Sequence, residues 1–252
     1  MKAFDNTAAA VVENLIRELG DAHKTVQRRA IDELVAIAAS GDSIVIEKLR
    51  ASIASTDRRV RWAAAYALAQ IGAGAFAMDS ADALCEAMAD DDGDIRWAAT
   101  NLMVQLGREN LAEISARLLK LAADGDHNAR KMALYCIRDL EIAGPELLAV
   151  LESAVHDADV HVRLAALSVL SRIRDASGQS MRIILECMKS DPDPGVRRAA
   201  ASALGNIRNA GADAMAALAS VAADSADESL ARAARGALNR LDKPLEKDRL
   251  EK

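Results

Sequence analysis

Aromatic residues are scarce in this chain of 252 residues. Trp, Tyr and Phe, two of each, make up 2% of the sequence, whereas apolar residues as a whole make up 51%. A core built of large rings is therefore excluded, and Ala, Leu, Val and Ile must fill it. Because Ala and Leu are strong helix formers and let helices pack closely, this composition favours an all-α protein.

Cysteine is also rare, and the features of secretion or membrane insertion are lacking. Cys85, Cys136 and Cys187 form no CxxC pair, which argues against a disulfide framework and is typical of buried thiols in a reducing compartment. Asp5 and Glu13 interrupt the region where a signal peptide would be apolar, and no apolar run approaches the ~18 residues of a membrane span. We therefore expect a cytoplasmic protein that does not enter a membrane, and we assume a monomer.

Sequence motifs for cofactors and nucleophilic catalysis are absent. The chain contains no GxxxxGK[ST], GxGxxG or GxSxG pattern, so we expect no phosphate-cradling loop, no cofactor and no catalytic residue. The formal net charge of −6 lowers the expectation of a generic nucleic-acid binder, although it says nothing about local patches.

The strongest signal is a motif that returns every 33 to 35 residues. Its central apolar residue, called the anchor, is separated from the next copy by 34, 35, 34, 33, 34 and 34 residues. The seven anchors are Val26, Val60, Ile95, Ala129, Val162, Val196 and Leu230. Seven copies of a repeat of this length are typical of a solenoid.

Each repeat is predicted to be a helical hairpin. An alanine stands four residues after every anchor, and large aliphatic residues follow at eight and eleven residues. These offsets fall on one side of a helix that turns about 100° per residue, and another amphipathic segment precedes each anchor. The sequence therefore predicts a right-handed α-solenoid of about seven antiparallel hairpins in one domain, residues 1–241, followed by a charged tail, residues 242–252.

A ladder of Asp and Arg accompanies the anchors. The Asp stands three residues before the anchor, where it would cap the helix N-terminus. The Arg follows the anchor directly, close enough to pair with that Asp or with the Asp of the next repeat. The ladder consists of Asp57, Arg61, Asp92, Arg96, Asp126, Arg130, Asp159, Arg163, Asp193 and Arg197. It lapses in the first and last repeats, as expected of terminal repeats.

The motif D-x-x-V-R-x-x-A-x-x-A-L-x-x-I-G is clearest in DRRVRWAAAYALAQIG, residues 57–72, and in DPGVRRAAASALGNIR, residues 193–208. It resembles the HEAT repeat, specifically the short bacterial and archaeal form also seen in phycobilisome-lyase-type repeats, over residues 7–241. The resemblance implies a solenoid used mostly as a scaffold or adaptor, with second helices lining the concave side. Metal-dependent hydroxylases built from such repeats carry His-Glu iron ligands. No histidine here is followed by Glu, so we expect no metal.

A stripe on the second helices differs between repeats and is the candidate binding face. Residues two, six, nine and thirteen after the anchor point away from the buried side. Every Trp and Tyr falls on this stripe, which is also basic although the chain is acidic. The candidate partner-binding residues are Trp62, Tyr66, Trp97, Asn101, Lys131, Tyr135, Arg138, Arg108, Arg28, Arg198 and Arg232. Aromatic side chains next to Arg are typical of binding hot spots, so we expect exposed aromatic rings on the concave face.

Several functions fit this face. We favour a non-catalytic, protein-binding scaffold or adaptor that holds an acidic partner segment. One alternative is a nucleic-acid-binding protein, such as a DNA glycosylase resembling the HEAT-like alkylpurine enzymes. Trp62, Tyr66, Trp97 and Arg138 would then contact DNA, but the aromatic repeats lack a carboxylate on the stripe, and Asp139 is the nearest candidate.

A second alternative is a chromophore chaperone resembling the bilin lyases, in which basic residues would meet the propionates of a tetrapyrrole and aromatic rings would stack on it. The remaining interpretation is purely structural. In that case the tryptophans only shield the edge of a groove between helices.

Overall fold

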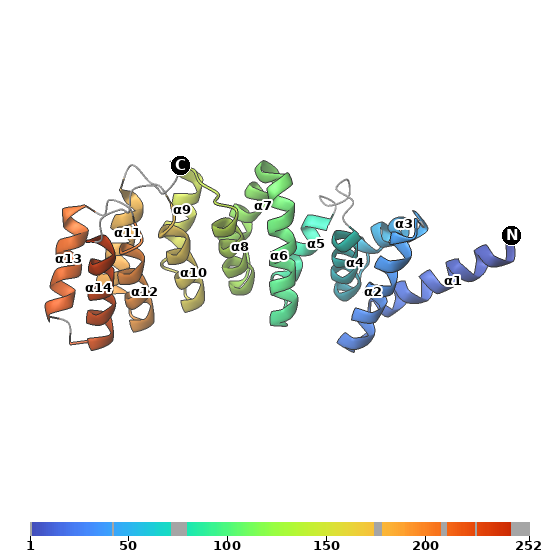
Figure 1. Ribbon diagram of the computed structural model, residues 1–252, viewed down its shortest axis with the longest axis horizontal. Coiled ribbons are helices and arrows are strands. Elements are labelled where there is room, and N and C mark those ends of the chain that lie inside the picture. Colours follow the sequence, from blue (N-terminus) through green and yellow to red (C-terminus); the bar gives the residue numbers. More distant parts are fainter. Residues whose placement is uncertain are drawn as a thin grey trace, which may run out of the picture. The chain divides into compact units, whose positions relative to one another are not determined.

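In the computed structural model, residues 2–41, 43–71, 80–173, 178–207, 211–224 and 226–242 are described. These residues form fourteen α-helices and no strand (Figure 1). The helices are α1 (Lys2–Glu18), α2 (Lys24–Ala39), α3 (Ser43–Ile53), α4 (Arg58–Ile71), α5 (Ala81–Ala87), α6 (Gly93–Glu109), α7 (Leu111–Asp124), α8 (His127–Asp139), α9 (Pro145–Ala154), α10 (Val160–Leu170), α11 (Gln179–Ser190), α12 (Pro194–Leu204), α13 (Ala212–Asp224) and α14 (Glu228–Leu241). The all-α class expected from the sequence is confirmed.

The helices follow the predicted repeat. All seven anchors lie in even-numbered helices, which are the second helices of the repeats, and each odd-numbered first helix precedes its partner in the chain. Helices of one repeat pack together, as α3 does with α4 and α13 with α14. The described residues therefore contain the seven predicted first-helix and second-helix pairs.

The alanine column explains how such small side chains build a core. The alanine four residues after each anchor is completely buried in every repeat. These residues are Ala30, Ala64, Ala99, Ala133, Ala166, Ala200 and Ala234. A methyl group is the smallest apolar side chain that still excludes water, so neighbouring helices approach closely at this level. Leucines such as Leu68 and Leu170, four residues further on, are also fully buried and fill the wider space.

The chain divides into two compact units, Met1–Arg117 and Leu118–Lys252, with the division inside α7. In the N-terminal unit, the second helices α2, α4 and α6 pack in sequence. In the C-terminal unit, α8, α10, α12 and α14 form a layer of second helices, and α9, α11 and α13 form a layer of first helices. The prediction of one domain over residues 1–241 stays a prediction. The predicted tail from residue 243 lies outside the described residues.

The ladder aspartates lie at helix N-termini, as the sequence predicts. Asp92, Asp126, Asp159 and Asp193 are N-cap residues whose side chains accept hydrogen bonds from backbone N–H groups of the first turn. Asp57 accepts in the same way from the Arg59 N–H at 2.8 Å. Each carboxylate therefore satisfies donors that a helix start leaves without partners.

The arginine partners differ in part from the prediction. Among the described residues, none of these arginines is ion-paired with the aspartate of its own helix. Instead, the guanidinium bonds the loop between the two helices of its repeat, as Arg163 does by donating to the Asp157 carbonyl at 2.9 Å. Four of the five arginines also reach an acid of the following repeat. The pairs are Arg61–Glu86 at 2.6 Å, Arg130–Asp157 at 2.7 Å, Arg163–Asp191 at 3.0 Å and Arg197–Asp227 at 3.9 Å.

Two of these acids belong to a second set of aspartates that the sequence motif did not single out. Each member stands two residues before an N-cap aspartate and accepts a hydrogen bond from its N–H group at 2.8 to 2.9 Å. They are Asp90, Asp157 and Asp191. The ladder is therefore a structural device that closes each loop and, through Asp157 and Asp191, joins it to the neighbouring repeat.

Candidate functional site

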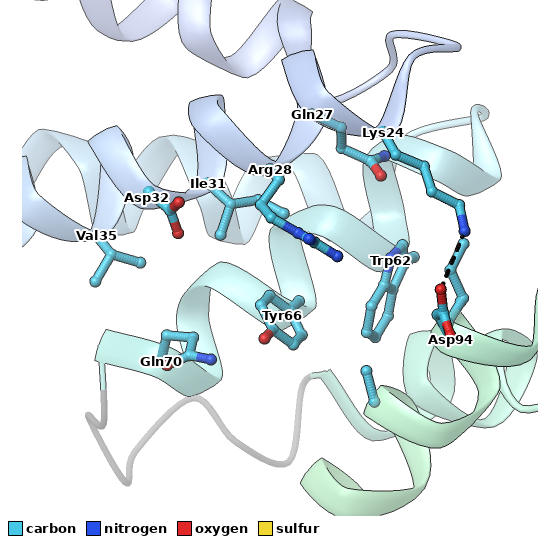
Figure 2. Close-up of a pocket in the computed structure, with 12 residues that line it drawn as sticks. Lys24, Gln27, Arg28, Ile31, Asp32, Val35, Trp62, Tyr66, Gln70 and Asp94 are labelled. Carbon is cyan, nitrogen blue, oxygen red and sulfur yellow. Dashed lines mark hydrogen bonds and ion pairs between the residues drawn. The ribbon is translucent and has the colours of Figure 1, made fainter.

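Part of the predicted binding stripe surrounds a pocket in the N-terminal unit. The pocket has a volume of about 300 Å³ and lies on the second helices α2, α4 and α6 (Figure 2). It is lined by Lys24, Gln27, Arg28, Ile31, Asp32, Val35, Trp62, Tyr66, Gln70, Asp94, Ile95 and Ala98. Helix α2 supplies half of these residues, so the first repeat contributes more to the pocket than its sequence suggested.

Two aromatic rings of α4 line the pocket. The ring centroids of Trp62 and Tyr66 are 5.1 Å apart and the rings are inclined at 52°, a tilted arrangement typical of favourable aromatic pairs. Tyr66 is half-buried. The residues that follow Trp62 on α4, Ala63 to Ala65, are completely buried and small.

The expectation that Trp62 is exposed was wrong. Only 7% of its surface is accessible, because the indole lies where side chains of α2 and α6 also converge (Figure 2). Trp62 therefore serves the core as well as the pocket wall. This position agrees with the structural interpretation that a tryptophan shields the gap between neighbouring helices.

The charged residues of the pocket are balanced. Arg28 and Asp32 are exposed on consecutive turns of α2, and neither forms an ion pair among the described residues. Lys24 instead extends to the start of α6, where its Nζ bonds the carboxylates of Asp92 and, at 3.4 Å, Asp94. The bond with Asp92 raises the pKa of Lys24 and lowers the pKa of Asp92. Two cations and two anions therefore line the pocket, which is not basic as a whole.

Other predicted residues of the N-terminal unit lie outside the pocket. Trp97 is 51% exposed on α6, and Asn101 and Arg108 are exposed further along this helix. Helix α6 contributes Asp94, Ile95 and Ala98 to the pocket instead. The stripe offsets are therefore not equivalent in all repeats, because α6 presents a different side to the pocket than α4 does.

The predicted residues of the C-terminal unit have different surroundings. The Arg138 Nε donates to Asp139 Oδ1 at 2.7 Å, which raises the pKa of Arg138, and its Cζ lies 5.0 Å from the centre of the Tyr135 ring. The charge of Arg138 is therefore already compensated. Lys131 is half-buried and donates to Asn128 Oδ1 at 3.3 Å. Arg198 is partly exposed on α12, and Arg232 is exposed on α14.

Sequence reasoning missed Asp32 as a partner of the aromatic pair. A carboxylate was sought only in the repeats that carry Trp and Tyr, whereas α2 of the first repeat packs against α4 and brings Asp32 into the same pocket. Asp32 occupies the same repeat offset as Tyr66, one repeat earlier. This equal offset in adjacent repeats was the sequence signal that could have identified Asp32.

In the described parts of the chain, the cysteines and potential metal ligands are not arranged as a disulfide or a metal site. All three thiols are free; Cys136 and Cys187 are buried, as predicted, and Cys85 is partly buried. Burial raises the pKa of Cys85 and of Cys187 to about 11, so both thiols stay protonated at neutral pH. Among the described residues, no group of three His, Cys, Asp or Glu side chains is arranged to hold a metal ion. None of the described helices is long and apolar enough to cross a membrane.

The chain consists of repeats that each contain a first and a second helix, with a buried alanine column and capped second helices. These features define an all-α helical-repeat protein. A family model described as HEAT repeats matches residues 12–103 and 176–239, which is more than half of the chain. The chain belongs to the HEAT-repeat family. The resemblance noted in the sequence is thereby confirmed.

One solved structure supports this fold. A HEAT-like repeat protein from the archaeon Thermococcus onnurineus NA1 aligns with a TM-score of 0.52 at 13% identity, covering 92% of this chain and 97% of that one. The CpcE and CpcF complex of phycocyanin lyase from Nostoc sp. PCC7120 aligns at 16% identity over 91% and 94% of the two chains, with a TM-score of only 0.39. At these identities the first likeness concerns the fold alone, and the second carries no argument. A search of curated proteins found no match.

Proposed function

We propose that this HEAT-repeat protein is a non-catalytic binding scaffold that holds an acidic partner segment on its second helices. The pocket on α2, α4 and α6 is the main attachment site in this proposal. The observation that carries it is a recess with an aromatic pair on one side and an arginine without an ion-pair partner on the other. Such a combination is typical of residues that dominate binding energy. The cytoplasmic location stays a prediction from the sequence.

The pocket suits one side chain of a partner better than a large ligand. Its volume of about 300 Å³ lies at the lower end of small-molecule pockets. Tyr66 and Val35 offer apolar surface, and Arg28 offers a planar guanidinium able to bond a carboxylate with two N–H groups. We therefore expect a partner segment that places an apolar or aromatic side chain beside an Asp or Glu.

Selection of peptides from a random library tests this function without knowledge of the natural partner. We expect the full chain to enrich peptides in which an apolar or aromatic residue lies next to an acidic one. The variants Tyr66→Ala and Arg28→Ala should each weaken the selected peptides about tenfold, since each removes one hot-spot contact worth ~1–2 kcal/mol. Tyr66 is preferable to Trp62 because Trp62 also belongs to the core.

The matched control is Arg59→Ala, which removes an exposed arginine of α4 outside the pocket. It should leave peptide affinity within twofold. Circular dichroism should give the same helix content for all three variants. Unchanged binding by both Tyr66→Ala and Arg28→Ala would exclude the pocket as the attachment site.

Binding to nucleic acid with base removal is a second candidate that one observation favours. Asp32 supplies the carboxylate beside Trp62 and Tyr66 that the aromatic repeats themselves lack. Release of bases from alkylated DNA, abolished by Asp32→Asn, would support this candidate over the scaffold. If no base is released, the salt dependence of DNA affinity gives a second test. An affinity that falls only slightly as the salt concentration rises would argue against extensive phosphate contacts.

A further inference from the structure

In the C-terminal unit, the layer of second helices α8, α10, α12 and α14 leaves positive charge without a carboxylate partner. The carboxylates on these helices, Asp139 and Glu228, are already paired with Arg138 at 2.7 Å and Arg235 at 2.6 Å. The layer of first helices differs because it exposes both negatively and positively charged side chains. Glu146, Glu186 and Asp213 stand there together with Arg182 and Lys189.

The unneutralised charge of the second-helix layer is concentrated on α12 and α14. Arg198 and Arg232 occupy the same offset in consecutive repeats, and neither has a carboxylate partner among the described residues. Arg240 donates through Nη2 to the Ser202 carbonyl at 3.1 Å. This acceptor is neutral, so it does not compensate the charge of Arg240. The three arginines on these two adjacent helices therefore favour an acidic ligand.

The packing of α12 against α14 limits the distance between the two arginine positions. Gly205, the C-cap residue of α12, lies so close to α14 that an added Cβ would stand 2.7 Å from the Ala237 Cα. Close packing of this kind corresponds to helix axes about 8–10 Å apart. A polyproline II segment advances about 3.1 Å per residue with three residues per turn, so its side chains recur on one side every ~9 Å.

We propose that Arg198 and Arg232 bind an extended acidic protein segment, with carboxylates three residues apart facing the two arginines and Arg240 adding charge beside them. This inference rests on the proposed scaffold function, because it specifies the chemistry of a partner on the second helices. It adds a surface in the C-terminal unit that is separate from the N-terminal pocket. The two surfaces differ in character, since one is recessed and aromatic and the other is arginine-rich.

A protein segment fits this surface better than a nucleic acid. Phosphate-backbone binding commonly neutralises about 6–10 phosphates, whereas α12 and α14 offer three arginines without carboxylate partners. Stacking on bases needs aromatic side chains, and the sequence from residue 118 onward contains Tyr135 as its single aromatic residue. Tyr135 lies beside Arg138 on α8, away from α12 and α14 in the chain.

Fluorescence anisotropy of labelled peptides on the full chain tests the proposal. The probe is a twelve-residue peptide with Glu at every third position and Pro or Ala between, compared with a peptide of equal composition whose Glu residues are contiguous. The spaced peptide should bind at least fivefold more tightly. Arg198→Ala with Arg232→Ala should weaken it at least tenfold. Equal affinity of the two peptides, or less than twofold loss in the double variant, would overturn the proposal.

The matched control removes two cations from the opposite layer. Arg182→Ala with Lys189→Ala changes the net charge equally on exposed positions of α11 and should alter affinity less than twofold. A loss equal to that of the double arginine variant would mean that overall charge, not this surface, attracts the peptide. A duplex oligonucleotide that displaces the peptide at physiological salt and binds more tightly would favour nucleic acid instead.

The test separates this inference from the proposed function. Tyr66→Ala lies in the N-terminal unit and should leave binding of the acidic probe within twofold. Loss of library-selected peptides in Tyr66→Ala together with unchanged probe binding in the double arginine variant would retain the scaffold and reject the C-terminal surface. No effect of either change on its own ligand would reject both.

Discussion

Arg163 and Asp191 are the most buried ion pair among the described residues. Their side chains are 11% and 5% exposed, and Asp191 accepts from Arg163 Nε at 3.0 Å and Nη2 at 3.2 Å. Asp191 also accepts from the Asp193 N–H at 2.9 Å. One carboxylate therefore organises a loop and compensates a guanidinium from the preceding repeat. A buried pair costs desolvation when it forms, but it costs more when one partner is removed.

Asp191→Ala should lower the free energy of unfolding by ~3–5 kcal/mol, because it leaves the Arg163 charge buried without a carboxylate to compensate it. Urea denaturation at pH 7 measures this loss. Asp139→Ala removes the carboxylate of the more exposed pair with Arg138 and should cost less than ~1 kcal/mol. Asp191→Asn keeps an acceptor for the loop and should fall between the two. Equal effects of Asp191→Ala and Asp139→Ala would contradict the structural role of the buried pair.

Residue-scale prediction from the sequence succeeded where one repeat determines the environment and failed where two repeats meet. The N-cap aspartates were placed correctly because capping depends on positions two or three residues along the same helix. Trp62 was expected to be exposed because its own helix points it away from the alanine column. Its burial depends on side chains of α2 and α6, which the helical period of α4 does not reveal.

The stability of helix α10 is expected to depend on pH through its N-cap residue, Asp159. Asp159 accepts from the His161 N–H at 2.7 Å and the Val162 N–H at 3.3 Å. Desolvation opposes ionisation of Asp159, but these hydrogen bonds outweigh it and lower the pKa below its usual value. The stabilisation by this carboxylate is therefore fully present above the unfolded pKa, near ~4, and is lost as pH falls through the lower folded value.

Asp159→Ala should cost ~1 kcal/mol at pH 7, since it removes the acceptor for the first turn of α10. The difference from the unsubstituted chain should shrink as pH falls from ~4 through the lower folded pKa of Asp159, below which both forms lack an ionised cap. Urea midpoints measured from pH 7 to pH 3 check this. Glu47→Ala, an exposed substitution on α3, should have little effect at pH 7. A loss for Asp159→Ala that stays constant down to pH 3 would show that the ionised carboxylate is not the source.

At the scale of the whole molecule, each repeat contacts mainly its neighbours, and the contacts group into two units. Stability in such arrays is approximately a sum of local terms, so a defect in one unit need not unfold the other equally. Leu68 in the N-terminal unit and Leu170 in the C-terminal unit occupy equivalent, completely buried positions. They provide a matched pair of core substitutions.

Leu170→Ala should cost ~2–5 kcal/mol through loss of apolar burial and the cavity left behind. Hydrogen exchange should increase mainly within residues 118–242, whereas Leu68→Ala should increase it mainly within residues 9–117. Mass spectrometry of peptides from both variants measures the distribution. A uniform increase across the chain in both variants would indicate one cooperative domain, as the sequence predicts for residues 1–241.

The sequence by itself determined the architecture of this protein. A period of 33 to 35 residues, an unbroken alanine column and a capping aspartate are local signals, and they sufficed to predict the seven pairs of first and second helices and the HEAT-repeat family. The tertiary structure alone decided which stripe residues meet. Tyr66 and Trp62 share a pocket with Asp32 and Arg28, whereas Trp97 lies outside it. The physical reason is that the fold of one hairpin depends on spacing within a repeat, but a pocket depends on how side chains of successive repeats fill the space between them.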